Sequence, residues 1–242
     1  MKKLIEDTVA TIIDSKFDIQ DCYYIPDVDC SQLTFGNKGL RFKATTLYID
    51  MRESTKILNK HNRGTVAKLH MAYFHTIVKI AKSLGGEVRS FNGDGMLVFF
   101  LGDTKTTINI AVQAALQMKY MLTESSVVSK LAKYSALNYG IGVDHGTIVC
   151  TKVGIQGFNN RDLVWIGNPV NKAVKIGDKC KAPNHIGISQ HVYGQLNDNL
   201  KIVLQKSGLG YNIPTDIWKS DIFTYNEEHE LFYTTHFHYT LH

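Results

Sequence analysis

A chain of 242 residues is long enough for one domain with a sizeable core and some additions. Its residues are 44% hydrophobic and 20% charged, and no apolar run approaches a membrane span, so we expect a globular, cytoplasmic protein without stable membrane insertion. The net charge of +5 is not gathered into runs, which predicts no nucleic-acid partner and equally suits a small anionic substrate. The four cysteines have no CxxC spacing, so neither a zinc site nor a disulfide framework is expected.

The N-terminal part, residues 1–42, is expected to form a helix and a lead-in to the main domain over residues 43–242. Residues 1–20 predict an amphipathic helix, because apolar side chains recur on one face. These side chains are Leu4, Ile5, Val9, Ile12 and Ile13. Such a face either packs against the protein's own core, which is the first expectation, or docks on a dimer partner. Residues 21–42 are polar with interspersed Pro and Gly and predict an ordered linker.

A strand that ends in an aspartate is predicted next. Residues 45–50 read Thr-Thr-Leu-Tyr-Ile-Asp, a short and largely β-branched or apolar run that ends at Asp50. A helix is expected to open just beyond it, at Ser54 and Thr55. The amides of a helix start, together with these two hydroxyls, would favour an anion such as a phosphate.

Residues 87–91 and 96–100 predict two further strands, joined by a tight Gly-Asp-Gly turn whose carboxylate is Asp94. Considered alone, this pattern is typical of an ordinary hairpin. If these strands are neighbours of the first one in a single sheet, however, Asp94 converges with Asp50. Two such carboxylates suit Mg²⁺, which completes its octahedron with phosphate oxygens and water. The pattern therefore predicts a site for a metal ion and a triphosphate.

Two long helices flank this hairpin. Residues 64–84 predict a helix with one buried stripe, ended by a pair of glycines at 85–86. The stripe consists of Val66, Leu69, Tyr73, Ile77, Ile80 and Leu84. The second helix is expected near residues 104–123. Its inward positions are Ile108, Val112, Ala115, and Met118 or Leu122.

Residues 135–144 and 147–153 are expected to be two strands of a hairpin that turns at residues 145–146. A strand or loop over 162–167 follows, and then a helix with Pro169 in its first turn. This order of elements predicts an α+β fold with a ferredoxin-like core, in which helices cover one face of a mainly antiparallel sheet.

Three blocks of this sequence resemble the class III nucleotidyl cyclases, in that family's order and at its approximate spacing. The blocks are residues 47–55 (LYIDMREST), 85–88 (GGEV) with 93–95 (GDG), and 165–173 (WIGNPVNKA). The resemblance covers about residues 43–190. It implies that residues 43–242 are a nucleotidyl cyclase catalytic domain with the family's ferredoxin-like fold, which converts a nucleoside triphosphate to a 3′,5′-cyclic monophosphate and pyrophosphate.

The same resemblance assigns roles to five residues. Two Mg²⁺ or Mn²⁺ ions per site are expected between Asp50, Asp94 and the carbonyl of Met51. Asn171 is expected to orient the ribose. Lys175, where the family usually has Arg, is expected to stabilise charge on the phosphates in the transition state. Lysine keeps the positive charge of arginine but loses its bidentate geometry.

In this family the metal carboxylates come from one subunit, and the helix with the asparagine comes from the other. The resemblance therefore implies composite sites. Because this chain contains all of these elements, it predicts a symmetric homodimer with two sites and no need for a different partner chain.

The expected base contacts differ from both purine patterns. Adenylate cyclases usually carry Lys, and guanylate cyclases Glu, three residues before the Gly-Asp, where this chain has Ser90. Seven residues before Asn171, where Asp, Thr or Cys is common, it has Val164. Tyr48, two residues before the first metal aspartate, is expected to close the pocket by packing on the base.

The compact chain, its long lead-in and the Ala173-x-Lys175 form of the third block look like the bacterial Pycsar pyrimidine cyclases. Those enzymes make cyclic UMP or cyclic CMP on phage infection, and a downstream effector senses the product. We expect UTP as the preferred substrate and CTP next. Two alternatives stay open: an adenylate cyclase with an atypical base pocket, and a non-catalytic module that binds a nucleotide or only dimerises.

Overall fold

The computed structural model describes residues 1–134, 136–155, 160–208 and 211–241. The strands of its main sheet are β1 (Asp18–Asp21), β2 (Lys38–Met51), β3 (Glu87–Asn92), β4 (Gly95–Leu101), β5 (Tyr139–Gly154), β6 (Arg161–Ile166), β7 (Ile186–Ser189), β10 (Lys219–Tyr225) and β11 (Glu228–Thr235). A separate hairpin consists of β8 (Ile202–Lys206) and β9 (Asn212–Asp216). The helices are α1 (Lys2–Asp14), α2 (Ser54–Lys60), α3 (Arg63–Ser83), α4 (Lys105–Thr123), α5 (Ser126–Ala132), α6 (Asn168–Lys179) and α7 (Gln190–Gln195), with a 3₁₀ turn over Asp198–Leu200.

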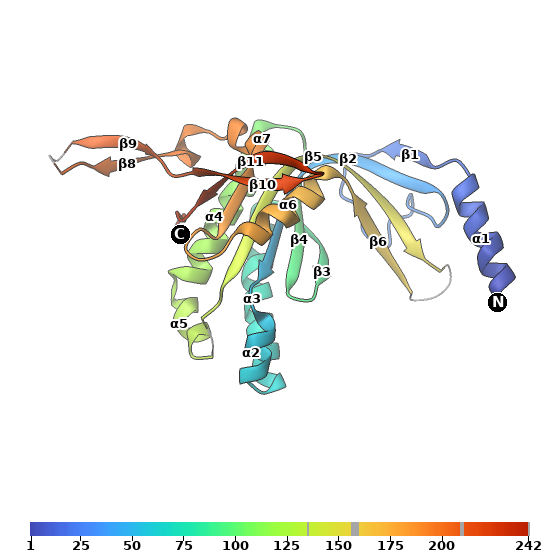
Figure 1. Cartoon of the computed structure of the whole chain (residues 1–242), viewed down its shortest axis with the longest axis horizontal. Coiled ribbons are helices and arrows are strands. Elements are labelled where there is room, and N and C mark those ends of the chain that lie inside the picture. Colours follow the sequence, from blue (N-terminus) through green and yellow to red (C-terminus); the bar gives the residue numbers. More distant parts are fainter. Residues whose placement is uncertain (135, 156–159, 209–210, 242) are drawn as a thin grey trace.

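The main sheet has the strand order β10-β11-β7-β5-β2-β4-β3, with β1 paired to β2 and β6 paired to β5. The run from β2 to β5, with α3 and α4 between strands, is the β-α-β-β-α-β arrangement of a ferredoxin-like fold. The expected α+β fold is therefore confirmed. Figure 1 shows the sheet in the middle of the molecule, with α1 and the β8–β9 hairpin at opposite ends. Within the described residues, no helix has the length and apolar character needed to cross a bilayer.

Alternate side chains of β2 face opposite sides of the sheet. Leu47, Ile49 and Met51 are buried in one core cluster with the inward faces of α3 and α4. Those two helices lie close to the residue ranges predicted for them. The apolar residues expected to face inward within these helices are buried, so both predictions are confirmed. Tyr48 and Asp50 point to the other side of the sheet.

Helix α6 packs on that second side, so helices cover both faces of the sheet and not only the one expected. The glycines of the two elements let their backbones touch. A Cβ on Gly142 of β5 would lie only 1.9 Å from the carbonyl oxygen of Ala173. A Cβ on Gly177 would lie 3.2 Å from the ring of Tyr48. The position of α6 is therefore fixed closely against the ends of β2 and β5 that carry the candidate site.

The prediction of a hairpin that turns at residues 145–146 is wrong. Strand β5 is continuous and pairs antiparallel with β2 from Gly39 opposite Thr151 to Met51 opposite Tyr139. Because β2 offers a partner along this whole length, the positive φ of 157° at Gly146 is absorbed within the strand and makes no turn. Residue 135, where the first of the two expected strands began, lies outside the described residues.

The lead-in before β2 is ordered, as expected. Ile25 and Leu33 are buried against Phe42 of β2 and Phe99 of β4. Strand β2 itself begins at Lys38, within the stretch that the sequence assigned to the lead-in.

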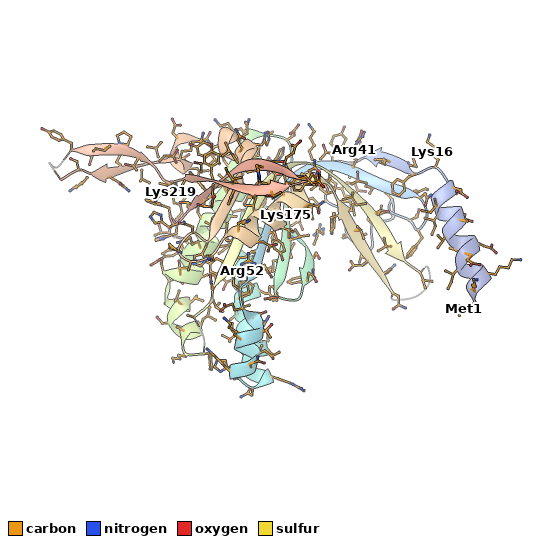
Figure 2. All side chains as sticks on the ribbon, in the orientation of Figure 1. Met1, Lys16, Arg41, Arg52, Lys175 and Lys219 are labelled. Atoms are coloured by element: carbon orange, nitrogen blue, oxygen red, sulfur yellow. The ribbon has the colours of Figure 1, made fainter. Side chains whose placement is uncertain are left out.

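Helix α1 ends at Asp14 and does not cover the core. Its five apolar residues are 51% to 76% exposed. After the helix, β1 pairs parallel with the first residues of β2, which places α1 at the outer end of the sheet (Figures 1 and 2). The side-chain amide of Asn37 donates to the carbonyl oxygens of Ile12 and Ser15 at 2.6 and 2.9 Å, so this placement is defined. The expectation that the helix packs on the core is wrong, and docking on a partner stays a prediction.

Candidate active site

The structure brings Asp50 and Asp94 to the same end of the sheet. Asp50 is the last residue but one of β2, and Asp94 lies in the turn between β3 and β4. Because β2 and β4 pair up to Ile49 opposite Met96, this turn lies beside the end of β2. A Cβ on Gly95 would lie 3.0 Å from an oxygen of the Asp50 carboxylate, so only glycine allows the turn to approach so closely.

The surroundings of Asp50 disfavour its ionised form. Burial raises the pKa of its carboxyl to about 6, and the charge of Asp94 adds to the rise. The guanidinium of Arg52, 3.4 Å from the Asp50 carboxylate, partly offsets both effects. Burial also raises the pKa of Tyr48 well above its usual value, so its hydroxyl stays protonated beside the two aspartates. The site therefore carries negative charge that an added cation would stabilise.

This donor set fits a divalent metal ion. Among the described residues there is no cluster of three or more His, Cys, Asp or Glu side chains that could hold a metal. Mg²⁺ does not require one, because it binds through one or two carboxylates and fills its other positions with phosphate oxygens, carbonyls and water. Asp50 and Asp94 supply the carboxylates, and the backbone of Met51 lies next to the Asp50 carboxylate, whose pKa its amide lowers.

The repulsion between the two carboxylates predicts a stabilising substitution. Without metal at pH 7.5, Asp94→Asn should raise the melting temperature by about 2 °C, since 1 kcal/mol is worth roughly 2–4 °C in a chain of this size. The pKa of Asp50 is raised from 3.8 to about 6, so its ionisation costs stability in full above pH 6, and this cost declines as the pH falls from 6 towards 3.8. The part that comes from Asp94 is lost once Asp50 is protonated in the folded protein. Thermal unfolding should therefore show the gain at pH 7.5 and none at pH 4.5. An equal gain at both pH values would show that the repulsion is not its source.

The residues expected to contact the triphosphate lie at the start of α2. The helix begins at Ser54, after Glu53 in a left-handed conformation with a φ of 60°. Ser54 is half-buried and Thr55 is exposed. Both lie within five residues of Asp50, in the first turn of the helix that follows β2.

Asn171 and Lys175 lie on one face of α6, because they are four residues apart. Both are exposed, and in the part of the chain that the structure describes neither side chain has a hydrogen-bond or ion-pair partner. Lys175 and Arg52 both belong to the central part of the molecule (Figure 2). The side chains of Asn171 and Lys175 are therefore free to contact a substrate or another subunit.

The expected base contacts lie on other strands. Ser90 is half-buried on β3, directly after a bulge that leaves Arg89 without a partner residue on β4. Val164 is 40% exposed on β6, opposite Thr151 at the far end of β5. Among the described residues, no hydrogen bond links Ser90 or Val164 to the aspartates.

The side chain of Arg89 contacts the lead-in. Its guanidinium donates to the carbonyl oxygens of Ile25 and Pro26 at 3.1 and 2.8 Å and pairs with Glu87 at 2.9 Å. These hydrogen bonds hold the lead-in against β3, so the Arg89 side chain is not available to contact a nucleotide base.

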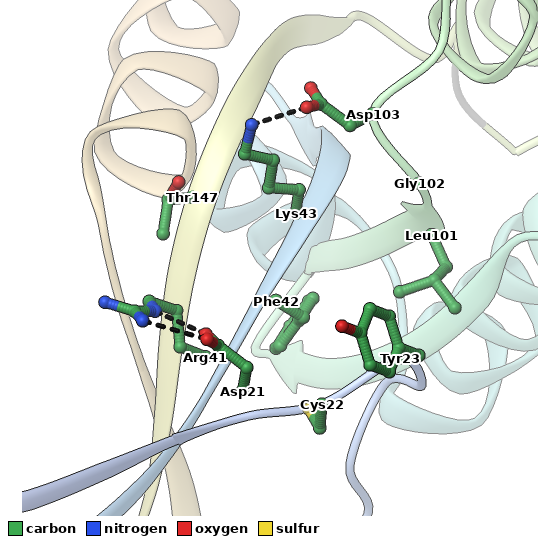
Figure 3. A pocket seen from close by; sticks show the side chains of 10 residues that line it. All are labelled: Asp21, Cys22, Tyr23, Arg41, Phe42, Lys43, Leu101, Gly102, Asp103 and Thr147. Atoms are coloured by element: carbon green, nitrogen blue, oxygen red, sulfur yellow. Dashed lines mark hydrogen bonds and ion pairs between the residues drawn. The ribbon is translucent and has the colours of Figure 1, made fainter.

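A pocket of about 500 Å³ opens near the start of β2, away from the aspartates (Figure 3). Its two cations are already paired: Arg41 with Asp21 at 2.6 Å, and Lys43 with Asp103. It therefore offers no excess positive charge to a triphosphate, and we do not place the substrate there.

The fold is that of the class III nucleotidyl cyclases. Residues 41–213 match the family model described as the adenylate and guanylate cyclase catalytic domain, so the chain belongs to that family and is a nucleotidyl cyclase.

Two curated proteins that are similar to this chain are both named uridylate cyclase. The chain is 30% identical to a uridylate cyclase of Xanthomonas perforans over 187 residues, which cover 76% of this chain and 78% of that protein. It is 26% identical to a uridylate cyclase of Burkholderia cepacia over 204 residues, which cover 83% and 85%. Among solved structures, the guanylyl cyclase Cya2 has a similar fold, with a TM-score of 0.65 over 81% of this chain and 92% of that one at 20% identity.

Proposed function

We propose that this chain is a pyrimidine nucleotidyl cyclase that acts as a homodimer and prefers UTP to CTP. The observation that carries the proposal is the pair Asp50 and Asp94, which meet at one sheet end where burial and repulsion favour a bound cation. The uridylate cyclases to which the chain is similar support the choice of base.

In the proposed reaction, the ribose 3′-oxygen forms a bond to the α-phosphorus, and the bond from that phosphorus to the pyrophosphate oxygen breaks. The proton of the 3′-hydroxyl passes to water. Two Mg²⁺ or Mn²⁺ ions held by Asp50, Asp94 and the Met51 carbonyl would lower the pKa of this hydroxyl and neutralise the pyrophosphate. The role of the aspartates is to position the metal ions. We assign no protein side chain as a general base.

The remaining groups hold the substrate in line for attack. Asn171 orients the ribose, and Lys175 stabilises the charge that develops on the phosphates. Ser54 and Thr55 contact the outer phosphates from the start of α2. The exposed and unpaired state of Asn171 and Lys175 supports a composite site, because it leaves both free to contact a nucleotide held at the aspartates of a second subunit.

A pyrimidine suits the expected base pocket better than a purine. The aliphatic side chain of Val164 offers no hydrogen bond, and Ser90 is shorter than the Lys or Glu that reads a purine edge. A smaller base that lies deeper would bring its own edge to Ser90, and Tyr48 would pack on the ring. A buried polar contact of this kind discriminates strongly, because a wrong base leaves it unpaired.

Competition among equimolar ATP, GTP, CTP and UTP with Mn²⁺, followed by mass spectrometry of the cyclic products, tests the proposal. We expect cyclic UMP to predominate and cyclic CMP to follow. Predominant cyclic AMP or cyclic GMP would overturn the choice of base and leave the cyclase chemistry. No cyclic product from any of the four would favour a nucleotide-binding module.

We place the reaction in the cytoplasm, where the product would act as a second messenger. By the resemblance to the Pycsar cyclases, a separate effector would sense the cyclic nucleotide during phage infection. This part of the proposal rests on the resemblance alone.

A further inference from the structure

Arg52 makes the most contacts of any charged group at the candidate site. Its Nη1 lies 3.4 Å from the Asp50 carboxylate and 3.2 Å from that of Asp178. Its Nε donates to the carbonyl oxygen of Cys180 at 3.3 Å, and its Nη2 donates to that of Gly177. The side chain is only 19% exposed, so these contacts are largely shielded from water.

These acceptors belong to the last turn of α6 and to Cys180, the residue that follows it. The carbonyls at a helix C-terminus lack partners within the helix and carry its partial negative charge, which an arginine satisfies. Space for the guanidinium comes from Gly140, whose added Cβ would lie 2.5 Å from the Arg52 Nη2. Gly140 is also the residue that pairs with Asp50 across β2 and β5.

The helix end that Arg52 holds is continuous with the groups expected to act on the substrate. Asp178 follows Lys175 by three residues and Asn171 by seven, so all three lie on one face of α6. A shift of the last turn would therefore move Lys175 and, to a smaller extent, Asn171.

We infer that Arg52 is a positioning residue that joins the metal-binding carboxylate Asp50 to the last turn of α6. One edge of its guanidinium offsets the charge of Asp50, and the other edges fix α6. With a divalent cation bound at Asp50, the guanidinium would be repelled toward Asp178 and the α6 carbonyls, and the last turn of the helix would be held more firmly.

This inference rests on the proposed function, and it adds a link between two sites. In a composite homodimer, Asp50 of one chain belongs to one site, whereas Asn171 and Lys175 of the same chain belong to the other. Arg52 would then transmit the arrival of metal at one site to the helix that serves the second.

Hydrogen exchange in the full-length protein tests the link without measuring activity. Addition of MnCl₂ alone should slow amide exchange in peptides that span the last turn of α6 in the wild type. The effect should be absent in Arg52→Gln and reduced in Arg52→Lys, which keeps the charge but loses the planar fork. Arg41→Gln is the matched control, because it breaks an Arg–Asp pair at the other end of β2 (Figure 3). An unchanged α6 on addition of MnCl₂ to the wild type would overturn the inference.

Kinetics supply a second readout in a heterodimer of an Asn171→Ala chain and an Asp94→Ala chain, which retains one complete composite site. Arg52→Gln placed in the Asp94→Ala chain, which supplies only α6 to that site, should lower kcat on the order of tenfold with little change in KM. An unchanged kcat would contradict the inference. Inactivity of the parent heterodimer would instead count against the composite site of the proposed function, and the exchange experiment would still decide the role of Arg52.

Discussion

Replacing either Asp50 or Asp94 with alanine is expected to abolish cyclic nucleotide formation, with a loss on the order of a thousandfold or more. Each substitution removes one of two carboxylates that converge where β2 ends and the β3–β4 turn begins. The remaining carboxylate would hold a divalent ion too weakly to neutralise a triphosphate. Folding should be retained, because neither side chain contributes an apolar contact to the core and the loss of one relieves repulsion with the other.

The measurement is product formation from the best nucleotide with saturating Mn²⁺, combined with thermal unfolding and sedimentation to verify the fold and the dimer. Asp103→Ala is the matched control, since Asp103 is an aspartate that pairs with Lys43 and His145 away from the site. Its activity should remain close to that of the wild type. Near-normal turnover by the Asp50 or Asp94 variant would show that the two-carboxylate assignment is wrong.

The second prediction with a large effect is that activity recovers when two inactive variants are mixed. Asp94→Ala and Asn171→Ala chains should each be inactive as homodimers, and a mixture of the two should regain activity. In a composite homodimer, each heterodimer has one site with both defects and one with neither. Random exchange makes half of the dimers heterodimers with one working site each, so roughly a quarter of the wild-type activity is expected.

Two affinity tags, purified in series, isolate the heterodimer and show that the subunits have exchanged. Mixing Asp50→Ala with Asp94→Ala chains is the control, because both defects lie in the same half of the site and no complete site can form. A verified Asp94→Ala and Asn171→Ala heterodimer without recovered activity would mean that each site is built within one chain.

The sequence was sufficient where the governing interactions are local. The 3.6-residue apolar repeat identified α3 and α4, and the glycine turn between two apolar runs identified the β3–β4 hairpin. The nearness of Asp50 and Asp94 also follows from such patterns, once their strands are assumed to be neighbours. The roles of these residues, in contrast, came from the family resemblance.

Features that depend on distant partners could not be predicted. Residues 145–146 look like a turn, and only the long pairing with β2 turns them into the middle of a strand. The apolar face of α1 suggested core packing, whereas the parallel pairing of β1 with β2 directs the helix elsewhere. The partners of Arg52 at the end of α6 lie more than 120 residues later in the chain, and no local signal distinguishes this arginine from a surface one.

The pairing of β2 with β5 also constrains how the molecule is made. Asp50 lies opposite Gly140, ninety positions later, so a ribosome must complete well over half of the chain before the end of β2 has its partner. Until then, β2 exposes an unpaired edge, which is a state prone to aggregation. Contacts of such long sequence separation close slowly, because the entropy of a long loop is lost before the contact forms. We therefore expect refolding to be slower than for a helical protein of this length, and the candidate site to be among the last parts to assemble.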